Sequence, residues 1–366
     1  GKREPKRSAS FHLQPNAIPA MFDHPSYDSH EGVHLFQDAA SGLKAIIAIH
    51  STARGPAAGG TRMWNFTSGE AMLKDVLRLS QGMSYKNAMA DIPLGGGKAV
   101  IWGNAKTDKS PALFRAFGRA VESLQGRYYT AEDVGIDVAD MAIVRQETAY
   151  VAGLDQGEAA SGDPSPVTAR GVFLGIVETA KRALGSGDLT GRTIAVQGVG
   201  SVGGYMCDHL AEAGANLIIT DIDQAALKAV ADRTGARIVA PDDIYDVEAD
   251  IFSPCALGAV INEQTLDRFR VKAIAGGANN QLVMPEMGEL LRRKGILYAP
   301  DYVINGGGII NVAAEISGNY SREWVDAKLA RLVQTLGEVL DEALTSGQPT
   351  NAVADRIARA RIAAAR

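Results

Sequence analysis

Two lysines in glycine-rich surroundings could supply acid-base chemistry. Lys86 lies in the first half of the chain, and Lys98 follows the glycine triplet 95–97. The second segment is not a nucleotide-binding P-loop, because Ile92 stands where that motif has its first glycine and Ala99 where it has serine or threonine. Three glycines before a lysine suggest a tight turn that lodges the ammonium in a cleft of low dielectric. Burial there lowers a lysine's pKa and makes it usable as a base. A surface lysine beside a flexible turn fits the same residues.

A second motif predicts a dinucleotide site. A β-like run at 193–197 leads into Gly198-Val199-Gly200-Ser201-Val202-Gly203, a G-x-G-x-x-G pattern placed where a strand gives way to a helix. The glycines permit a tight turn, let backbone approach a pyrophosphate and let helix and strand pack closely, while the helix N-terminus offers N–H groups to phosphates. The motif therefore predicts that this segment binds the pyrophosphate of a dinucleotide.

An aspartate beyond this motif predicts which dinucleotide binds. Asp221 ends the next β-like run, where a carboxylate can bind both ribose hydroxyls and would repel a 2'-phosphate. NAD is therefore favoured over NADP as the cofactor. The alternative is a glycine-rich turn with a helix-capping aspartate, and Asp223 can be the cap of the following helix, leaving Asp221 for the ribose.

One apparent metal motif is rejected. His30-Glu31-Gly32-Val33-His34 matches the H-E-x-x-H pattern of zinc proteases, which needs a helix to place both histidines one turn apart. Gly32 would interrupt that helix, and the β-like run 33–37 places His34 on a strand instead. We therefore predict no metal site, and we interpret His50 and His209 as structural.

Composition limits the class of protein. A chain of 366 residues exceeds what one hydrophobic core usually supports, so two domains are expected. Its net charge of -5 argues against a nucleic-acid partner, because binding phosphates takes clustered Lys and Arg. No apolar run approaches the roughly 20 residues needed to cross a membrane. Cys207 and Cys255 are the only cysteines and form no C-x-x-C pair, which fits a reducing cytoplasm.

The elements that must position these residues fall into two groups. The first half predicts a hairpin from 33–37 and 43–50, a strand at 99–102, and helices at about 70–83 and 111–125, the last with Ser110 and Pro111 at its start. The second half alternates helices at 168–184, 202–213 and 224–234 with strands at 193–197 and 216–220, which predicts a parallel sheet covered by helices.

These groups define the expected domains. The fold class is α/β, with an N-terminal α+β domain for substrate and oligomerisation over 31–152, a Rossmann-type domain over 153–335 and a cleft between them. Residues 1–30 are expected to be a disordered tail. Residues 336–366 are expected to form a C-terminal helix that returns to the first domain.

Many ordered motifs resemble the Glu/Leu/Phe/Val amino-acid dehydrogenase superfamily, and most closely its leucine dehydrogenase branch. These motifs are 55–64, 84–87, 95–98, 130–135, 163–168, 195–200, 275–281 and 299–308. The resemblance implies oxidative deamination, in which Lys86 binds the substrate's α-carboxylate, Lys98 is the base that activates water, and Asp133 moves protons at the amino nitrogen. It also implies that Asn279 lies beside substrate and nicotinamide and that Thr168 contacts the nicotinamide amide. From the residues alone, a helix N-cap is a better interpretation of Asp133 than a catalytic role.

The resemblance also implies a substrate pocket. By family position its wall is formed by Ala58, Gly59, Ala131, Ile309 and Val312. Glutamate dehydrogenases carry a lysine at position 58 and a serine at position 312, so this chain should exclude glutamate and accept leucine, isoleucine and valine. At position 58, however, the alanine resembles the residue of phenylalanine dehydrogenases. The alternative function is therefore that of a phenylalanine dehydrogenase.

The resemblance further implies a homo-oligomer assembled through the first domain, commonly an octamer. Rivals from other classes are a catalytically silent NAD-binding regulatory protein and a metalloprotease.

Overall fold

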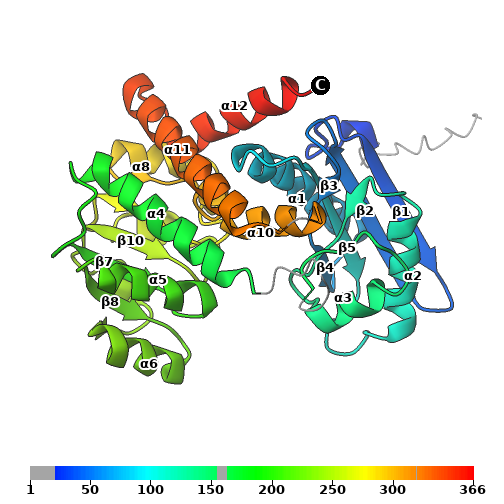
Figure 1. The fold of residues 1–366 in the computed structure, drawn as a ribbon, viewed down its shortest axis with the longest axis horizontal. Helices are drawn as coiled ribbons and strands as arrows, with labels where there is room; N and C mark the ends of the chain where they lie inside the picture. The colour runs from blue at the N-terminus through cyan, green and yellow to red at the C-terminus, as the bar shows by residue number, and fades with distance from the viewer. Residues whose placement is uncertain (1–20, 155–162, 319) are drawn as a thin grey trace, which may run out of the picture.

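The computed structural model describes residues 21–154, 163–318 and 320–366, which form two units that lie side by side, each built on a sheet (Figure 1). The first unit contains a six-stranded sheet in the order β1-β2-β5-β3-β6, with β4 paired to β5. Its elements are β1 (Gly32–Asp38), β2 (Leu43–Ser51), β3 (Ala57–Ala58), β4 (Thr61–Trp64), α1 (Gly69–Met89), β5 (Gly95–Trp102), α2 (Pro111–Glu122), β6 (Tyr128–Tyr129) and α3 (Val138–Val144), preceded by a 3-10 turn at Met21–Asp23.

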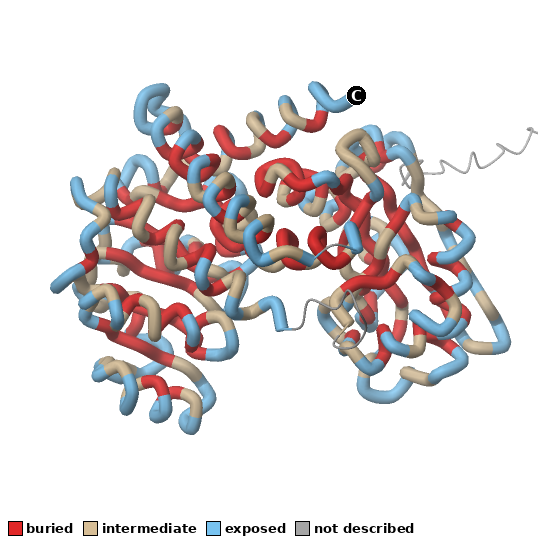
Figure 2. The backbone as a smooth tube through the Cα atoms, in the orientation of Figure 1, coloured by how far each residue is buried: buried red, intermediate tan, exposed pale blue. Residues whose placement is uncertain are grey.

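Alternating apolar residues place helices on both faces of this sheet. Ile46 and Val100 pack with Met72 and Val76 of α1, whereas Ile47 and its neighbours on β2 and β5 pack with α2. Successive strand residues point to opposite faces, so nearly every residue of β2 and β5 is buried. These two strands form the centre of the first core, as the buried segments in Figure 2 show.

The second unit has the dinucleotide-binding topology that the sequence predicts. Its six parallel strands run in the order β12-β11-β10-β7-β8-β9, which is the 3-2-1-4-5-6 order of Rossmann folds. The strands are β7 (Thr193–Gln197), β8 (Asn216–Thr220), β9 (Arg237–Ile238), β10 (Ile251–Pro254), β11 (Ala273–Ile274) and β12 (Leu297–Tyr298). The order reverses between β7 and β10, and ligands bind at such a reversal.

Helices cover both faces of the second sheet and reach back to the first unit. They are α4 (Ser165–Ala183), α5 (Ser201–Glu212), α6 (Gln224–Thr234), α7 (Glu263–Leu266), α8 (Met287–Arg293), α9 (Asp301–Ile304), α10 (Gly307–Ile316), α11 (Arg322–Ser346) and α12 (Thr350–Ala363), with a 3-10 turn at Asp243–Tyr245. The C-terminal α12 packs on α1, and Arg359 donates to the Tyr85 hydroxyl at 2.6 Å. Within the described residues, none of these helices has the length and apolar character needed to cross a bilayer.

Three expectations need correction. Residues 21–30 are not a disordered tail, because His30 is buried and its Nε2 lies 3.0 Å from both the Leu77 carbonyl and the Ser80 hydroxyl; residues 1–20 lie outside the described part. Helix α1 continues six residues past the predicted end, to Met89. Residue 336 is not where a C-terminal segment begins, because it lies inside α11, whose buried face packs on α4.

Several local predictions are confirmed. Ser110 caps α2, with Pro111 as its first residue, and Asp223 caps α6 by accepting from two backbone N–H groups. His34 lies on strand β1, so the helix that a zinc-protease motif requires is not formed there. Residues 155–162, near the predicted start of the second domain at residue 153, lie outside the described residues.

Candidate active site

The glycine triplet before Lys98 does not form the tight turn that we expected; it is the first part of strand β5. The reason is close packing by neighbouring elements. A Cβ on Gly96 would lie 2.0 Å from the Ser84 backbone nitrogen on α1, and a Cβ on Gly97 would lie 2.8 Å from the Tyr128 ring. Gly96 therefore lets α1 lie directly on β5, and Gly97 makes room for the Tyr128 ring. Lys98 itself is 5% exposed, so the alternative of a surface lysine is wrong.

Asp133 lies on the connection between β6 and α3, next to Lys98. The Lys98 Nζ is 3.0 Å from the Asp133 Oδ2. Gly60 makes room for this connection, because a Cβ there would lie 2.4 Å from the Glu132 carbonyl oxygen and 3.0 Å from the Asp133 Cβ. Asp133 is not a helix cap, since α3 is capped by Asp137. The structure thus brings the two predicted catalytic residues into contact.

The environment changes the ionisation of both groups. Burial lowers the pKa of Lys98, and the neighbouring Asp133 carboxylate opposes that change without reversing it. Burial disfavours the charged form of Asp133, but the charges of Lys98 and Arg62 together hold the pKa of Asp133 below its usual range. Lys98 can therefore release its proton more readily than an ordinary lysine, while Asp133 stays ionised near neutral pH.

Lys86 projects from the last part of α1 and is half-buried. Burial lowers the pKa of Lys86 to about 8; the charge of Asp301 opposes this effect and the charge of Lys98 adds to it. Lys86 is thus electrostatically coupled to Lys98 and also to Asp133. A cation held here can pair with a carboxylate within reach of the Lys98–Asp133 pair.

The predicted pocket wall comes from both units. Ala58, 1% exposed, Ile309, 9% exposed, and the half-buried Val312 contribute to one hydrophobic cluster that continues from the first unit into α10. In Figure 1, α10 lies where the two units meet. Gly59 is required for close packing, because a Cβ there would lie 1.8 Å from the Gly97 carbonyl oxygen. The half-buried Ala131 accepts from the Thr61 N–H at 2.8 Å, which keeps it beside β4.

The glycine-rich turn of the second unit has the geometry of a phosphate cradle. Gly198 has φ of +93° and a Cβ there would lie 2.5 Å from Ala256, just after β10, so the turn sits at the reversal of strand order. A Cβ on Gly203 would lie 2.0 Å from the Gly198 carbonyl oxygen, whereas nothing lies within 4 Å of one on Gly200. Gly200 is the N-cap of α5 and makes no side-chain cap. The backbone over Gly200 is therefore open to a ligand.

Asp221 lies against this turn. Its Oδ2 accepts from the Val199 N–H at 2.7 Å and its Oδ1 accepts from the Asp223 N–H at 2.9 Å. Ser201 and Val202 form the first turn of α5. Since Asp223 is the cap of α6, Asp221 is left beside the cradle, where the sequence places a ribose contact.

Asn279 and Thr168 lie on separate elements of the second unit. The Asn279 Oδ1 accepts from the Asn305 amide at 2.8 Å, and the Thr168 hydroxyl donates to the Pro164 carbonyl at 3.0 Å in the first turn of α4. Thr168 also lies against the glycines that begin α10, because a Cβ on Gly308 would be 3.0 Å from its Oγ1. These contacts orient both polar side chains near the element that carries Ile309 and Val312.

Comparison with known proteins agrees with this geometry. Residues 30–150 match the family model "Glu/Leu/Phe/Val dehydrogenase, dimerisation domain", and residues 219–366 match "Glutamate/Leucine/Phenylalanine/Valine dehydrogenase". The chain is 52% identical to a leucine dehydrogenase from Geobacillus stearothermophilus over 337 residues, covering 92% of this chain and 91% of that one. The chain belongs to the Glu/Leu/Phe/Val dehydrogenase family.

Two further relatives are slightly more distant. A phenylalanine dehydrogenase from Bacillus thermotolerans is 47% identical over 340 residues, covering 92% of this chain and 89% of that one. The crystal structure of L-tryptophan dehydrogenase from Nostoc punctiforme superposes with a TM-score of 0.83 at 43% identity, covering 92% of this chain and 96% of that chain. The protein is thus an amino-acid dehydrogenase with a dimerisation domain and a Rossmann-like catalytic domain.

Amino-acid dehydrogenases of this family use a nicotinamide dinucleotide. The open backbone at Gly200 and the uncapped start of α5 fit its pyrophosphate. When bound, the dinucleotide supplies a hydride acceptor that no amino-acid side chain can provide.

Sequence reasoning missed the charged neighbours of the Lys98–Asp133 pair in this dehydrogenase. Arg62 on β4 contacts Asp133, and Asp75 on α1 contacts Arg62. Arg62 lies in the motif 55–64, so its position was noted without a role. Nothing local distinguishes Asp75 from other helix carboxylates, because its pairing depends on α1 lying across the sheet.

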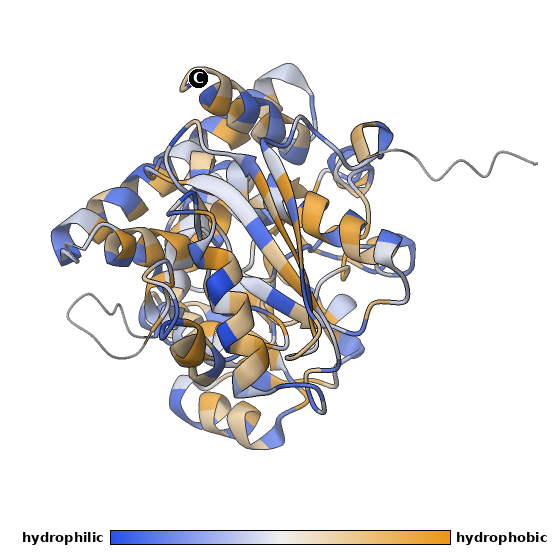
Figure 3. Cartoon of the chain, turned by 90° about the vertical axis from the view of Figure 1, so that its right-hand side faces the viewer, coloured by the Kyte–Doolittle hydropathy of each residue, from blue (hydrophilic) through white to orange (hydrophobic). Residues whose placement is uncertain are grey.

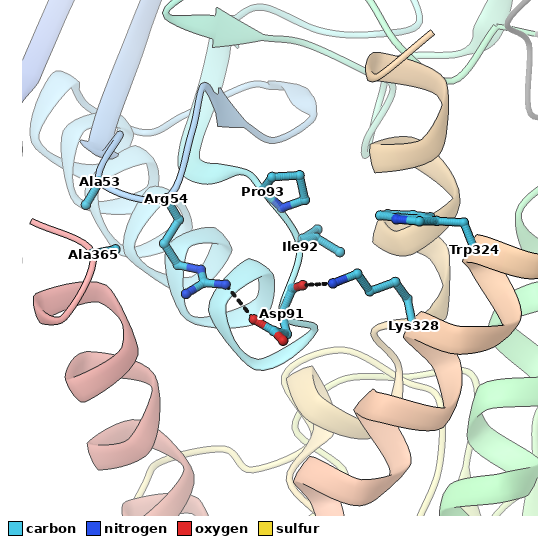
Figure 4. Close-up of a pocket in the computed structure, with 8 residues that line it drawn as sticks. All are labelled: Ala53, Arg54, Asp91, Ile92, Pro93, Trp324, Lys328 and Ala365. Carbon is cyan, nitrogen blue, oxygen red and sulfur yellow. Dashed lines mark hydrogen bonds and ion pairs between the residues drawn. The ribbon is translucent and has the colours of Figure 1, made fainter. Parts of the chain in front are cut away.

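The dehydrogenase also has a cavity of about 460 Å³ that contains none of the predicted site residues (Figure 4). It lies between the first unit and α11. Arg54 pairs with Asp91 at 2.7 Å, and Lys328 donates to the Asp91 carbonyl at 2.5 Å. The Lys328 contact joins α11 to the first unit at this seam, whereas the Arg54–Asp91 pair lies within the first unit.

Proposed function

We propose that this dehydrogenase catalyses the reversible NAD-dependent oxidative deamination of branched-chain aliphatic L-amino acids, with leucine, isoleucine and valine as substrates. The amino acid, NAD⁺ and water are converted to the 2-oxo acid, ammonium, NADH and a proton. One observation carries the proposal: the buried Lys98 lies 3.0 Å from Asp133, and the charges of this pair act on Lys86, which projects from the helix packed on the same strand.

Each charged residue has a distinct role in this reaction. Lys86 binds the α-carboxylate as a fixed cation. Asp133 takes a proton from the substrate ammonium, since hydride can leave Cα only when the nitrogen lone pair is free. Lys98, with its lowered pKa, then deprotonates the water that attacks the iminium carbon. Asn279 and Thr168 orient substrate and nicotinamide at the second unit.

The apolar wall determines the choice of side chain. Ala58, Ile309 and Val312 offer no partner for a γ-carboxylate. Burying an unpaired ion costs roughly several kcal/mol of binding free energy, so glutamate should be excluded. Gly59 and Ala131 leave room beside them. Each methylene in such a pocket is worth only about 1 to 3 kcal/mol, so several aliphatic substrates should be accepted.

Phenylalanine dehydrogenase activity is the second candidate, and Ala58 is the residue that favours it. Its small side chain leaves space that a leucine would fill. Changing Ala58→Leu should therefore lower kcat/KM for phenylalanine more than for leucine. If kcat/KM fell equally for phenylalanine and leucine, residue 58 would not limit the size of the substrate side chain.

The choice of NAD over NADP is supported by Asp221. Its carboxylate lies against the phosphate cradle through the Val199 N–H, so a 2'-phosphate on the ribose would meet a negative charge.

We further propose a cytoplasmic homo-oligomer, an octamer, assembled through the first domain. Support comes from that domain's surface, where Leu35 on the edge strand β1 is 69% exposed and Trp64 is 55% exposed. Figure 3 faces this unit, and hydrophobic stretches run along its strands. Exposed apolar side chains beside an unpaired strand edge are typical of an interface. Native mass measurement tests the number of subunits.

The deciding experiment for the reaction is an amino-acid panel followed at the NADH absorbance band. Leucine, isoleucine and valine should show the highest kcat/KM, phenylalanine should be weaker, and glutamate should show almost none. A kcat/KM for phenylalanine above all three aliphatic substrates would make the phenylalanine assignment correct.

A further inference from the structure

Arg62 connects the catalytic pair to helix α1. Its Nε lies 3.2 Å from the Asp133 Oδ2, and its Nη1 lies 3.2 Å from the Asp75 Oδ2 and 3.4 Å from the Asp75 Oδ1. Lys98 approaches the same Asp133 oxygen at 3.0 Å. Four charges of alternating sign thus form a chain from α1 through β4 to the β6–α3 connection and β5.

The secondary structure places these residues together. Strand β4 pairs in parallel with β5, with Arg62 opposite Val100, and α1 packs closely on β5 at Gly96. Side chains on β4 and on α1 therefore converge above Lys98. Arg62 and Asp75 have side chains 22% and 26% exposed, so solvent screens their ion pair less than it screens a surface pair.

The shape of the guanidinium decides what Arg62 can do. Its planar fork can contact two carboxylates at once, whereas the single ammonium of lysine cannot span both. Arg62 and Lys98 both hold the Oδ2 of Asp133, and within the described residues no hydrogen bond to Oδ1 is found. The orientation of Asp133 thus leaves Oδ1 for a substrate amine.

We propose that Arg62 is a positioning residue of the deamination reaction: held by Asp75 on α1, it fixes the Asp133 carboxylate against Lys98. The inference rests on the proposed roles of Lys98 and Asp133. Arg62 does not touch the reacting atoms; it acts through Asp133 and through its charge.

The charged groups that act on Lys98 come from each surrounding element. They are Asp133 on the β6–α3 connection, Arg62 on β4, and Asp75 and Lys86 on α1. Asp301 of the second unit acts in turn on Lys86. Arg62 disfavours the charged ammonium of Lys98, and Asp75 favours it. Removing each charge should therefore shift the titration of Lys98 in opposite directions.

The test compares Arg62→Gln with Asp75→Asn. In Arg62→Gln, the acid limb of the kcat/KM profile should move up by about one pH unit, because Lys98 holds its proton more tightly. In Asp75→Asn, the limb should move down. Both variants should lose roughly 10- to 100-fold in kcat through misplacement of Asp133. Arg62→Lys should keep the wild-type limb but not the full kcat.

A matched control is Arg54→Gln, which removes an arginine that also pairs with an aspartate of the first unit, Asp91, but at the seam. Its acid limb should stay at the wild-type pH. A purely structural role for Arg62 would lower activity and thermal stability in both test variants without opposite shifts. If the acid limb of the kcat/KM profile lay at the same pH in Arg62→Gln and Asp75→Asn, the proposal would be overturned.

A readout that needs no turnover separates this inference from the proposed function. Trace labelling with acetic anhydride across a pH series, followed by peptide mass spectrometry, measures the titration of the Lys98 amine in the free protein. The same opposite shifts are expected there. If the wild type used none of the panel amino acids, the proposed function would fail while the labelling would still decide whether Arg62 controls Lys98.

Discussion

The two units build their sites in different ways. In the first unit, Lys98 and Asp133 are side chains already in contact, held by backbone so tightly packed that a Cβ on Gly96 would lie 2.0 Å from α1. In the second unit, the cradle is backbone with open space, where a Cβ on Gly200 meets nothing within 4 Å. Acid-base chemistry needs fixed side chains in a water-poor setting, whereas a dinucleotide needs free N–H groups and room.

The largest expected effect is on Lys98, the side chain that we propose as the catalytic base. Lys98→Ala should reduce turnover by at least about 100-fold, because positioned acid-base groups typically supply that much. NADH affinity should stay nearly unchanged, because the cradle belongs to the other unit. Steady-state kinetics and NADH fluorescence titration measure the two quantities. Near wild-type turnover would remove Lys98 from the mechanism.

The contrast between packed and open glycines gives a matched pair of variants. Gly96→Ala should destabilise the protein by about 3 kcal/mol or more, because its Cβ would collide with helix backbone. Gly200→Ala should leave the unfolding free energy almost unchanged, since its φ of -66° suits any residue, and should mainly weaken NADH binding. Chemical denaturation and NADH titration of both variants check this. Similar losses of stability would contradict the contrast.

Acid should act on the first unit through a buried histidine. Burial lowers the pKa of His30 to about 4, so below pH 6.5 the unfolded chain takes up a proton that the folded chain does not. His30 therefore does not change the free energy of unfolding above pH 6.5. As the pH falls toward 4, it lowers the free energy of unfolding by up to about 3 kcal/mol. Urea denaturation between pH 7 and 4 measures the slope, and His30→Gln should flatten it. An unchanged slope in that variant would assign the acid sensitivity to other groups.

The smallest expected effect concerns cofactor choice in the open site. Asp221→Ser should narrow the preference for NAD over NADP by about 10-fold, because it removes repulsion of the 2'-phosphate. The ratio of kcat/KM for the two cofactors is the measurement. Comparable values for both cofactors in the wild type would show that Asp221 does not discriminate between them.

Local signals allowed the second unit to be predicted well. The glycine motif 198–203, Asp221 and the capping Asp223 all lie where the sequence places them, because turn, cap and strand patterns depend on residues close in the chain. The hairpin of β1 and β2 follows from the same kind of signal. The apolar wall at Ala58, Ile309 and Val312 came from family resemblance, and the structure gathers these residues in one cluster.

The sequence by itself determined the two-unit architecture, the dinucleotide cradle and the identity of Lys86, Lys98 and Asp133 as candidates. Only the tertiary structure decided that 95–97 is a strand and not a turn, that residues 21–30 are packed, and that Arg62 joins Asp133 to Asp75. The physical reason is the range of the interactions. Caps and turns are satisfied within a few residues, whereas a strand of three glycines and a bridging guanidinium are stabilised by elements far away in the chain.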